Sequence, residues 1–199
     1  MNRRTLLRGL LSGVGAAALT GIGLNDALAH HTRGFRRRRR RGNGIAAKWL
    51  PQTVRFSGYR PGTIVVDPHN RFLYLVQARG KARRYGVGVG RAGLAFQGSA
   101  TIGWKAKWPR WTPTRNMIRR EPQKYAKYAN GVPGGPGNPL GARALYLMKN
   151  GRDTYYRIHG TTQPWSIGQA VSNGCIRMVN EHVIDLYDRV RPGARVVVL

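Results

Sequence analysis

Short apolar runs separated by turn residues fill the chain from about Pro61 to its end, and this pattern predicts strands. The clearest pair is GTIVVDPHNRFLYLVQ, residues 62–77, in which two apolar runs flank the turn sequence DPHN and predict a hairpin. Other segments of strand character are ARRYGVGVG (82–90), ATIGWKAKWPRW (100–111), ARALYLMK (142–149), YYRIHG (155–160) and PGARVVVL (192–199). Helical periodicity is scarce, so the predicted class is mainly β, a sandwich of twisted sheets.

One late segment, NEHVIDLYDRV at 180–190, predicts a helix packed against those sheets. Asn180 suits the N-cap and Glu181 the first turn. The apolar residues expected on one face of this helix are Val183, Ile184, Tyr187 and Val190.

Residues 108–141 are too long, and too rich in Gly, Pro and aromatic residues, for a simple connection between strands. Long loops in compact domains often bind substrate, so we expect this segment to cover a site. Trp111 and Tyr125 are its candidate substrate-binding residues. A disordered insertion is the alternative, but disordered segments are usually poor in aromatic residues.

The N-terminal residues 1–29 have the pattern of a bacterial export signal of the twin-arginine type. Arg3 and Arg4 precede a mild apolar stretch, and the sequence ALA at 27–29 suits signal peptidase. A membrane anchor is the alternative, but the stretch is shorter than the roughly 20 residues that a spanning helix needs. We therefore expect an exported protein of the periplasm or cell envelope.

The 199 residues include 35 Lys plus Arg against 7 Asp plus Glu, which gives a formal charge of +28. Residues 30–59 are expected to form a basic disordered tail and lead-in, with six consecutive arginines at Arg36–Arg41. A net charge of this size indicates which partners the protein attracts, but it does not indicate the fold. We expect the arginine run to attract an anionic envelope surface. A non-enzymatic polyanion binder is a rival interpretation. No nucleic-acid motif accompanies the run, so no nucleic acid is expected as partner.

Cys175 is the only cysteine, so no disulfide can form within the chain. The residues SNG before it are typical of a turn, which makes the thiol accessible. A buried structural cysteine that behaves as a small apolar residue is the alternative. His159, Arg177 and backbone N–H groups would supply the electropositive surroundings that a thiolate needs.

Cys175 and His159 are a candidate nucleophile and proton donor/acceptor. A thiol becomes a good nucleophile when a base takes its proton or an ion pair holds it as thiolate. A third group should then fix the imidazole, and the candidates are Ser172 and the backbone carbonyl of Gly160.

Backbone N–H groups on the turn before the thiol are candidates for an oxyanion hole. Those of Asn173, Gly174 and Cys175 can converge on the oxygen of an acyl-transfer intermediate. Arg177 suits a bidentate contact with a substrate carboxylate or, alternatively, a structural salt bridge. No metal site is predicted, because the histidines lack ligand-like spacing with the cysteine.

The segment IHGTTQPWSIGQAVSNGCIRM, residues 158–178, resembles the active-site signature of the L,D-transpeptidases, the YkuD-type catalytic domain. The residues that carry the resemblance are His159, Gly160, Ser172, Gly174, Cys175, Ile176 and Arg177. Many members have His directly before the Gly-Cys pair, where this chain has Asn173. GTIVVDPHNRFLYLV, WTPT and PGGPGNPLGARALYL also resemble the family, so the resemblance covers roughly residues 60–199.

The resemblance implies a YkuD-like β-sandwich of twisted mixed sheets over 60–199, with one or two short helices and a long active-site loop. Members cleave the bond after meso-diaminopimelate in a donor tetrapeptide stem, release D-alanine and pass the acyl group from cysteine to an amine. Peptidoglycan stem peptides, and an envelope protein as acyl acceptor, are the implied partners, and no cofactor is implied. An L,D-carboxypeptidase or another cysteine hydrolase remains a rival, because water can replace the amine.

Overall fold

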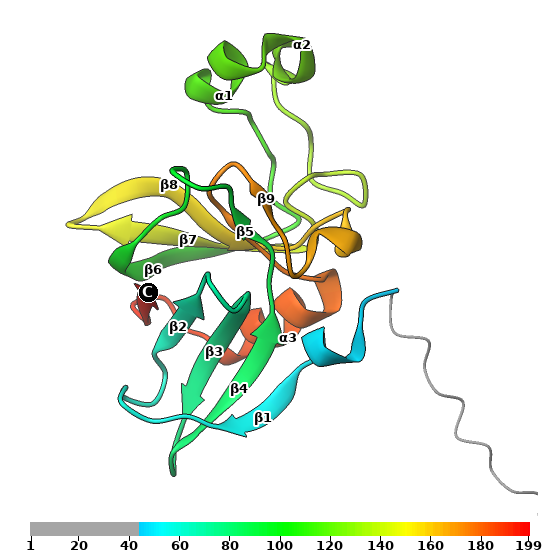
Figure 1. Cartoon of the computed structure of the whole chain (residues 1–199). Helices are drawn as coiled ribbons and strands as arrows, with labels where there is room; N and C mark the ends of the chain where they lie inside the picture. Colours follow the sequence, from blue (N-terminus) through cyan, green and yellow to red (C-terminus); the bar gives the residue numbers. More distant parts are fainter. Residues whose placement is uncertain (1–43) are drawn as a thin grey trace, which may run out of the picture. The chain divides into compact units, whose positions relative to one another are not determined.

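Two hydrogen-bonded sheets carry the strands of the computed structural model, which describes residues 44–199 (Figure 1). The larger sheet has nine strands in the order β1-β4-β3-β2-β11-β6-β7-β8-β10, and the smaller pairs β5 with β9. The strands are β1 Gln52–Arg55, β2 Ile64–Asp67, β3 Phe72–Gln77, β4 Lys81–Gly86, β5 Val89–Gly90, β6 Gly98–Lys107, β7 Arg143–Lys149, β8 Arg152–His159, β9 Ala170–Ser172, β10 Ile176–Arg177 and β11 Arg195–Val198. The expected export signal and the arginine run lie outside the described residues.

The predicted hairpin is confirmed as β2 and β3, which pair in antiparallel fashion from Ile64↔Leu75 to Asp67↔Phe72. The Asp67 carboxylate closes the turn by accepting hydrogen bonds from the backbone N–H and the side-chain amide of Asn70, at 2.9 and 2.7 Å. The other segments predicted as strands coincide with β4 and β5, β6, β7, β8 and β11.

The last strand, β11, joins the two halves of the large sheet. It pairs in parallel with β2 and in antiparallel fashion with β6, which makes the sheet mixed. In Figure 1, β2–β4 lie below and β6–β8 above, and buried side chains of both groups share one core. Members of that core include Ile64, Leu73, Leu145, Ile158 and Leu186. The mainly β fold with mixed sheets, predicted from the sequence, is confirmed.

The large sheet begins earlier than the boundary expected at residue 60. Strand β1 pairs with β4 from Gln52↔Arg84 to Arg55↔Lys81, within the segment expected as a lead-in. A short 3-10 helix, η1 (Ala47–Trp49), precedes it, and the Trp49 ring lies 5.1 Å from that of Phe72. This aromatic contact gives residues 47–55 an anchor that their apolar content alone does not indicate.

The predicted late helix is α3 (Asn180–Arg189), but its cap differs from the expectation. Val179 occupies the N-cap position, and Asn180 is the first helical residue. The Asn180 side-chain oxygen instead accepts a hydrogen bond from the Ala142 N–H at 3.0 Å. The residues buried on α3 are His182, Val183 and Leu186, whereas Ile184 and Tyr187 are only partly buried.

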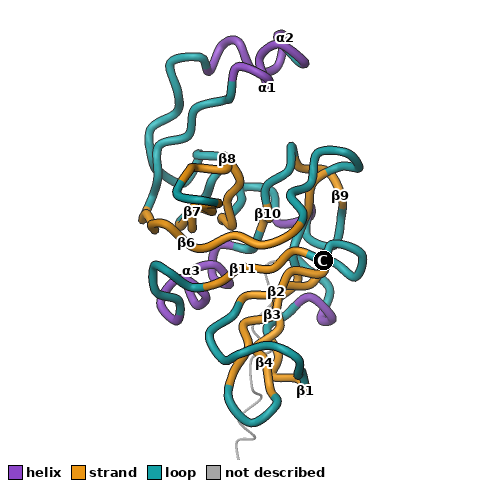
Figure 2. Tube along the Cα trace, turned by 90° about the vertical axis from the view of Figure 1, so that its left-hand side faces the viewer, coloured by secondary structure: helices purple, strands orange, loops and turns teal. Residues whose placement is uncertain are grey.

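Residues 108–141, called the insertion below, contain helices that were not predicted. These are α1 (Arg115–Arg120), α2 (Pro122–Tyr125) and the 3-10 helix η2 (Ala126–Tyr128). Thr114 caps α1 by accepting a hydrogen bond from the Met117 N–H at 3.2 Å. Figures 1 and 2 show α1 and α2 beyond the sheets, at the ends of two loop segments. No helix between residues 44 and 199 has the length and apolar character needed to cross a membrane.

Candidate active site

Two neighbouring parallel strands bring Cys175 and His159 to one face of the large sheet. Strand β10 pairs with β8 so that Ile176 lies beside Ile158 and Arg177 beside His159. Ile158 and Ile176 are both buried in the core, at 0% and 4% exposure. Since successive side chains of a strand point to opposite faces, His159 points away from that core, and Cys175 is the residue directly before β10.

The turn that carries the thiol is held by Ser172. Its hydroxyl donates to the Cys175 carbonyl at 2.6 Å and accepts from the Gly174 N–H at 3.1 Å. Gly174 has φ +123°, and a Cβ there would meet the Leu94 carbonyl oxygen at 2.5 Å and the Tyr156 ring at 2.6 Å. Only glycine therefore fits this turn.

These bonds correct two expectations about the turn. Ser172 was a candidate for orienting the imidazole, but its hydroxyl bonds only within its own turn among the described residues. The Gly174 N–H was a candidate oxyanion donor, but it already has an acceptor. The N–H groups of Asn173 and Cys175 have no backbone or side-chain acceptor within residues 44–199, so these two are the candidate donors that remain.

The His159 ring is oriented by the neighbouring carbonyl. Its Nδ1 lies 2.6 Å from the Gly160 oxygen, and the residue is only 5% exposed. Because a carbonyl can only accept, Nδ1 carries the proton and Nε2 is left as an acceptor. Burial, together with the positive charge of Arg177, lowers the pKa of His159 to about 4. The imidazole is therefore neutral at pH 7 and able to take a proton.

The Cys175 thiol donates to the carbonyl oxygen of Tyr155, with an S···O distance of 3.9 Å. Tyr155 has φ +61° and lies where the register of β8 against β7 shifts between Asp153↔Met148 and Arg157↔Tyr146. Such bulges re-aim groups beside active sites. Burial raises the pKa of the Cys175 thiol, so the resting pair is a neutral thiol and a neutral imidazole.

Two arginines flank the pair on the same face, and they differ in their partners. Arg157 binds the Asp153 carboxylate with two bonds of 2.7 Å. Arg177 donates to the Gln163 side-chain oxygen at 3.0 Å and has no carboxylate partner in the part of the chain that the structure describes. The structural salt bridge considered for Arg177 is therefore absent there, and its positive charge is free for an anionic ligand.

Asn173 links the thiol turn to the insertion. Its side-chain N–H donates to the Tyr125 hydroxyl at 2.7 Å, and its oxygen accepts from Arg91 at 3.0 Å and from Arg120 at 3.4 Å. Arg91 in turn forms an ion pair with Glu121 at 3.0 Å. The insertion thus contacts the turn through polar side chains on both α1 and α2.

The two aromatic residues expected to bind substrate lie together in the insertion. The Trp111 ring is 6.3 Å from that of Tyr125 and 5.8 Å from that of Tyr128, and Trp111 forms a β-bridge with Val132. Tyr125 is 7% exposed, so its ring supports the insertion and offers little surface to a ligand.

Residues 61–198 match the YkuD family, described as the L,D-transpeptidase catalytic domain. The chain belongs to this family. The probable L,D-transpeptidase ErfK/SrfK of Escherichia coli (strain K12) is 35% identical over 152 residues, which are 75% of this chain and 46% of that protein. This chain thus spans about half the length of that relative.

Two other similar proteins are matched over nearly their whole length. A putative L,D-transpeptidase in the ATP synthase subunits region (ORF 5) of Fuscovulum blasticum is 31% identical over 204 residues, 100% of this chain and 98% of that one. A solved structure described as a probable carnitine operon oxidoreductase from Brucella melitensis is 61% identical, with a TM-score of 0.54. The match covers 78% of this chain and 96% of the Brucella chain.

Several residues of this L,D-transpeptidase domain site were missed from the sequence. Tyr155 and Arg157 precede the His159 motif and read there only as part of a strand. Arg91 reaches the thiol turn from a distant segment through Asn173, and Glu121 binds Arg91. Side chains alternate between the two faces of a strand, so the spacing of two residues places Arg157 on the same face as His159. This spacing is the sequence signal that could have identified Arg157 as a site residue.

Proposed function

We propose that the chain is a peptidoglycan L,D-transpeptidase with Cys175 as nucleophile and His159 as its base. The observation that carries the proposal is the pairing of β8 with β10, which places the neutral imidazole of His159 on the strand beside the one that the thiol directly precedes. Family membership supports the reaction class, and the residue roles are inferred from the geometry.

In the first half of the proposed reaction, His159 Nε2 takes the thiol proton as the sulfur attacks the carbonyl carbon of meso-diaminopimelate that is bonded to the D-alanine nitrogen in a donor tetrapeptide stem. The carbonyl oxygen becomes an oxyanion, which the N–H groups of Asn173 and Cys175 would stabilise. The C–N bond then breaks, and His159 returns its proton to the leaving D-alanine amine. A thioester on Cys175 remains.

In the second half, an acceptor amine attacks the thioester carbonyl and His159 takes a proton from that amine. The new amide forms as the C–S bond breaks, and the thiol recovers its proton. A second stem as acceptor gives a 3–3 cross-link, and an envelope protein as acceptor becomes attached to the wall. Arg177, which lies beside His159 without a carboxylate partner among residues 44–199, is assigned to a carboxylate of the stem.

We also propose that the protein is exported to the periplasm or cell envelope by residues 1–29. The run Arg36–Arg41 would follow the cleavage site and hold the enzyme near anionic envelope polymers. Both proposals rest on sequence pattern alone.

The Brucella structure raises an oxidoreductase as a second candidate. Residues 88–93, GVGRAG, match the G-x-G-x-x-G dinucleotide pattern. That pattern binds a pyrophosphate where a strand leads into the N-terminus of a helix. Here β5 leads through residues 91–97, which form no helix, into the antiparallel strand β6. The local structure therefore does not favour dinucleotide binding at this sequence.

Incubation of the full chain with purified tetrapeptide muropeptides, followed by mass analysis of the products, tests the proposal. Cross-linked dimers with release of D-alanine are the expected result. Tripeptide without dimer would instead identify an L,D-carboxypeptidase or another cysteine hydrolase. No change in the muropeptides, with the protein bound to sacculi, would identify a non-enzymatic polyanion-binding envelope protein.

A further inference from the structure

Strands β6, β7 and β8 lie side by side and carry a row of three large side chains that the proposed reaction does not use (Figure 1). The row, called the outer row below, consists of the paired residues Trp104, Tyr146 and Arg157. The next pair, Lys105 and Leu145, points the other way, since Lys105 bonds carbonyl groups at the end of α3 and Leu145 is buried in the core. The outer row therefore lies on the face of the sheet opposite α3.

The two aromatic rings of the outer row are stacked, and one of them is accessible. The centres of the Trp104 and Tyr146 rings are 4.3 Å apart, with 16° between their planes. Trp104 is 41% exposed, and because Tyr146 covers one face of its indole, the exposed part is the other face and the edge. The face of an aromatic ring is electron-rich and attracts the weakly positive C–H groups on one side of a sugar ring.

Polar groups of both signs stand beside these rings. The guanidinium carbon of Arg157 is 4.3 Å from the centre of the Tyr146 ring and 5.9 Å from that of Trp104. Asp153 binds this guanidinium through two bonds of 2.7 Å, and its side chain is 28% exposed. The carboxylate can accept from a hydroxyl group and the guanidinium can donate to one. Because the two charges offset each other, this place suits a neutral, hydroxyl-rich ring better than an anion.

The outer row lies at a defined distance from the thiol. Cys175 donates to the carbonyl oxygen of Tyr155 in β8, two residues before Arg157. Cys175 also directly precedes β10, and the sheet order from there is β10-β8-β7-β6. Three strand spacings of about 4.8 Å separate β10 from β6, so Trp104 lies about 14 Å across the sheet from the strand that follows the thiol.

The donor stem of the proposed reaction has a matching length. Between its reacting carbonyl and the sugar lie diaminopimelate, two further residues and the acid unit that joins the stem to the sugar. Four such units, fully extended, span about 14 Å. A stem that begins at Cys175 and crosses β8 and β7 therefore brings its sugar to Trp104.

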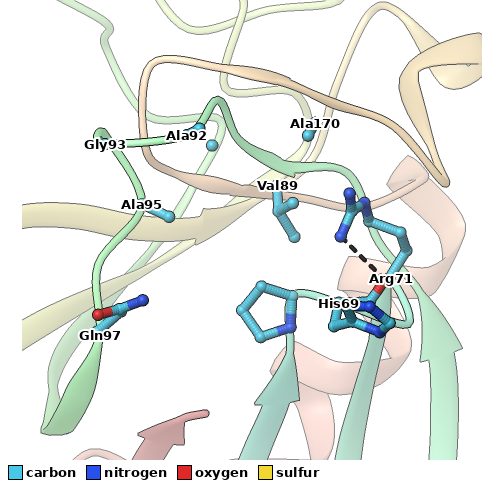
Figure 3. A pocket seen from close by; sticks show the side chains of 10 residues that line it. His69, Arg71, Val89, Ala92, Gly93, Ala95, Gln97 and Ala170 are labelled. Carbon is cyan, nitrogen blue, oxygen red and sulfur yellow. Dashed lines mark hydrogen bonds between the residues drawn. The ribbon is translucent and has the colours of Figure 1, made fainter.

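A separate cavity of about 570 Å³ lacks these features (Figure 3). The turn of the β2–β3 hairpin, strand β5, residues 92–97 and Ala170 enclose it. None of the described residues that line it is Trp, Tyr or Phe, so a sugar ring finds no aromatic face there. The outer row is therefore the better candidate for a sugar.

We propose that Trp104 and Tyr146 bind the sugar that carries the donor stem, an N-acetylated hexosamine, while Asp153 and Arg157 bond its hydroxyl groups. The inference rests on the proposed function, because the length of the stem is counted from Cys175. It adds a substrate preference, in which stems attached to the glycan are used better than free peptides.

The first test compares two donors on the full chain, the tetrapeptide attached to its disaccharide and the same tetrapeptide without sugar. The measured quantity is kcat/KM for release of D-alanine. Trp104→Ala is the test variant and Trp165→Ala the matched control. Trp165 is 59% exposed and belongs to the 3-10 helix η3 (Pro164–Ser166), outside the outer row.

We expect the unmodified chain to prefer the disaccharide donor roughly tenfold, through a lower KM, because the sugar contact is the same in the ground state and the transition state. Trp104→Ala should bring the ratio of the two kcat/KM values close to one, and Trp165→Ala should preserve the preference. Equal use of both donors by the unmodified chain, or the same ratio in both variants, would overturn the inference and leave the proposed function intact.

An NMR titration decides the matter if Trp104→Ala misfolds. The disaccharide without peptide is added at millimolar concentration to the full chain carrying Cys175→Ala, and the indole N–H signals are followed. The Trp104 signal is the one lost in Trp104→Phe, and we expect it to shift while the Trp165 signal stays in place. No shift, or a shift of Trp165 alone, would overturn the sugar site. Absence of D-alanine release from both donors would instead refute the proposed function, and the titration then decides the sugar site by itself.

Discussion

The hydrogen bond from Asn173 to Tyr125 holds the insertion against the thiol turn, and Tyr125→Phe removes its acceptor. The bond is 2.7 Å long, and Tyr125 is 7% exposed. A neutral hydrogen bond contributes about 1 kcal/mol net, and a buried partner left unpaired costs about 1–3 kcal/mol. Asn173 is only partly buried and keeps its bonds to Arg91 and Arg120, so the lower figure applies.

We therefore expect Tyr125→Phe to lower kcat/KM on tetrapeptide muropeptides about fivefold, which corresponds to about 1 kcal/mol. Backbone amides of residues 115–128 should also exchange faster with solvent, because the insertion opens locally without global unfolding. Tyr128→Phe is the matched control. Tyr128 contacts the same Trp111 ring edge-on at 5.8 Å, and its hydroxyl has no hydrogen-bond partner among residues 44–199.

A double-mutant cycle decides whether the bond itself is responsible. If it is, Tyr125→Phe should add less than about 0.5 kcal/mol to the effect of Asn173→Ala, because the bond between the two side chains is already absent in the Asn173→Ala variant. Fully additive effects, or equal losses in Tyr125→Phe and Tyr128→Phe, would refute the reasoning and leave the insertion without a specific contact to the site.

Four further predictions follow from the same geometry. Cys175→Ala should abolish turnover and His159→Ala should lower it by orders of magnitude, measured by mass analysis of muropeptides; full activity in Cys175→Ala would exclude the mechanism. The His159 pKa is about 4 in the folded protein against an ordinary 6.5, so unfolded chains bind the extra proton. Stability should then fall as pH drops from 6.5 to 4, by up to about 3 kcal/mol, and urea titrations of His159→Gln should lack this part of the slope. Gly174→Ala should leave little activity, because its φ of +123° and its contacts exclude a Cβ; near-normal turnover would show that the turn can shift. Deleting residues 30–44 should leave turnover of soluble muropeptides unchanged but weaken co-sedimentation with sacculi at low salt, since that segment contains seven arginines, six of them consecutive.

The sequence predicted the strands well because their signals are local. The apolar runs on the two sides of DPHN supply buried side chains to β2 and β3, and the terminal RVVV supplies them to β11. The strand at 52–55 was missed because its burial is slight and it is held by pairing with β4. Helices α1 and α2 were missed because each is short, and neither has an apolar face of helical period.

The candidate site was predictable only in part, because sequence patterns report local structure and not contacts between distant segments. Cys175 and His159 carry motif residues, and Gly160 could be named because its carbonyl adjoins the ring that it orients. The role of Ser172 was misjudged because a hydroxyl two residues before Gly174 has a closer local acceptor and donor in its own turn. The link from Asn173 to Tyr125 joins segments far apart in sequence, and no local pattern encodes such a contact.

The resting charges of the site bear on how the proposed reaction begins. Burial raises the pKa of the thiol and lowers that of the imidazole, so an ion pair is not the stable resting form. After burial, the charge of Arg177 is the largest cause of the low His159 pKa. A substrate carboxylate bound at Arg177 would offset that charge and raise the basicity of His159 when the carbonyl carbon is in place. In the proposed reaction, substrate binding at Arg177 would therefore activate the thiol, which would stay protonated and weakly nucleophilic when no substrate is bound.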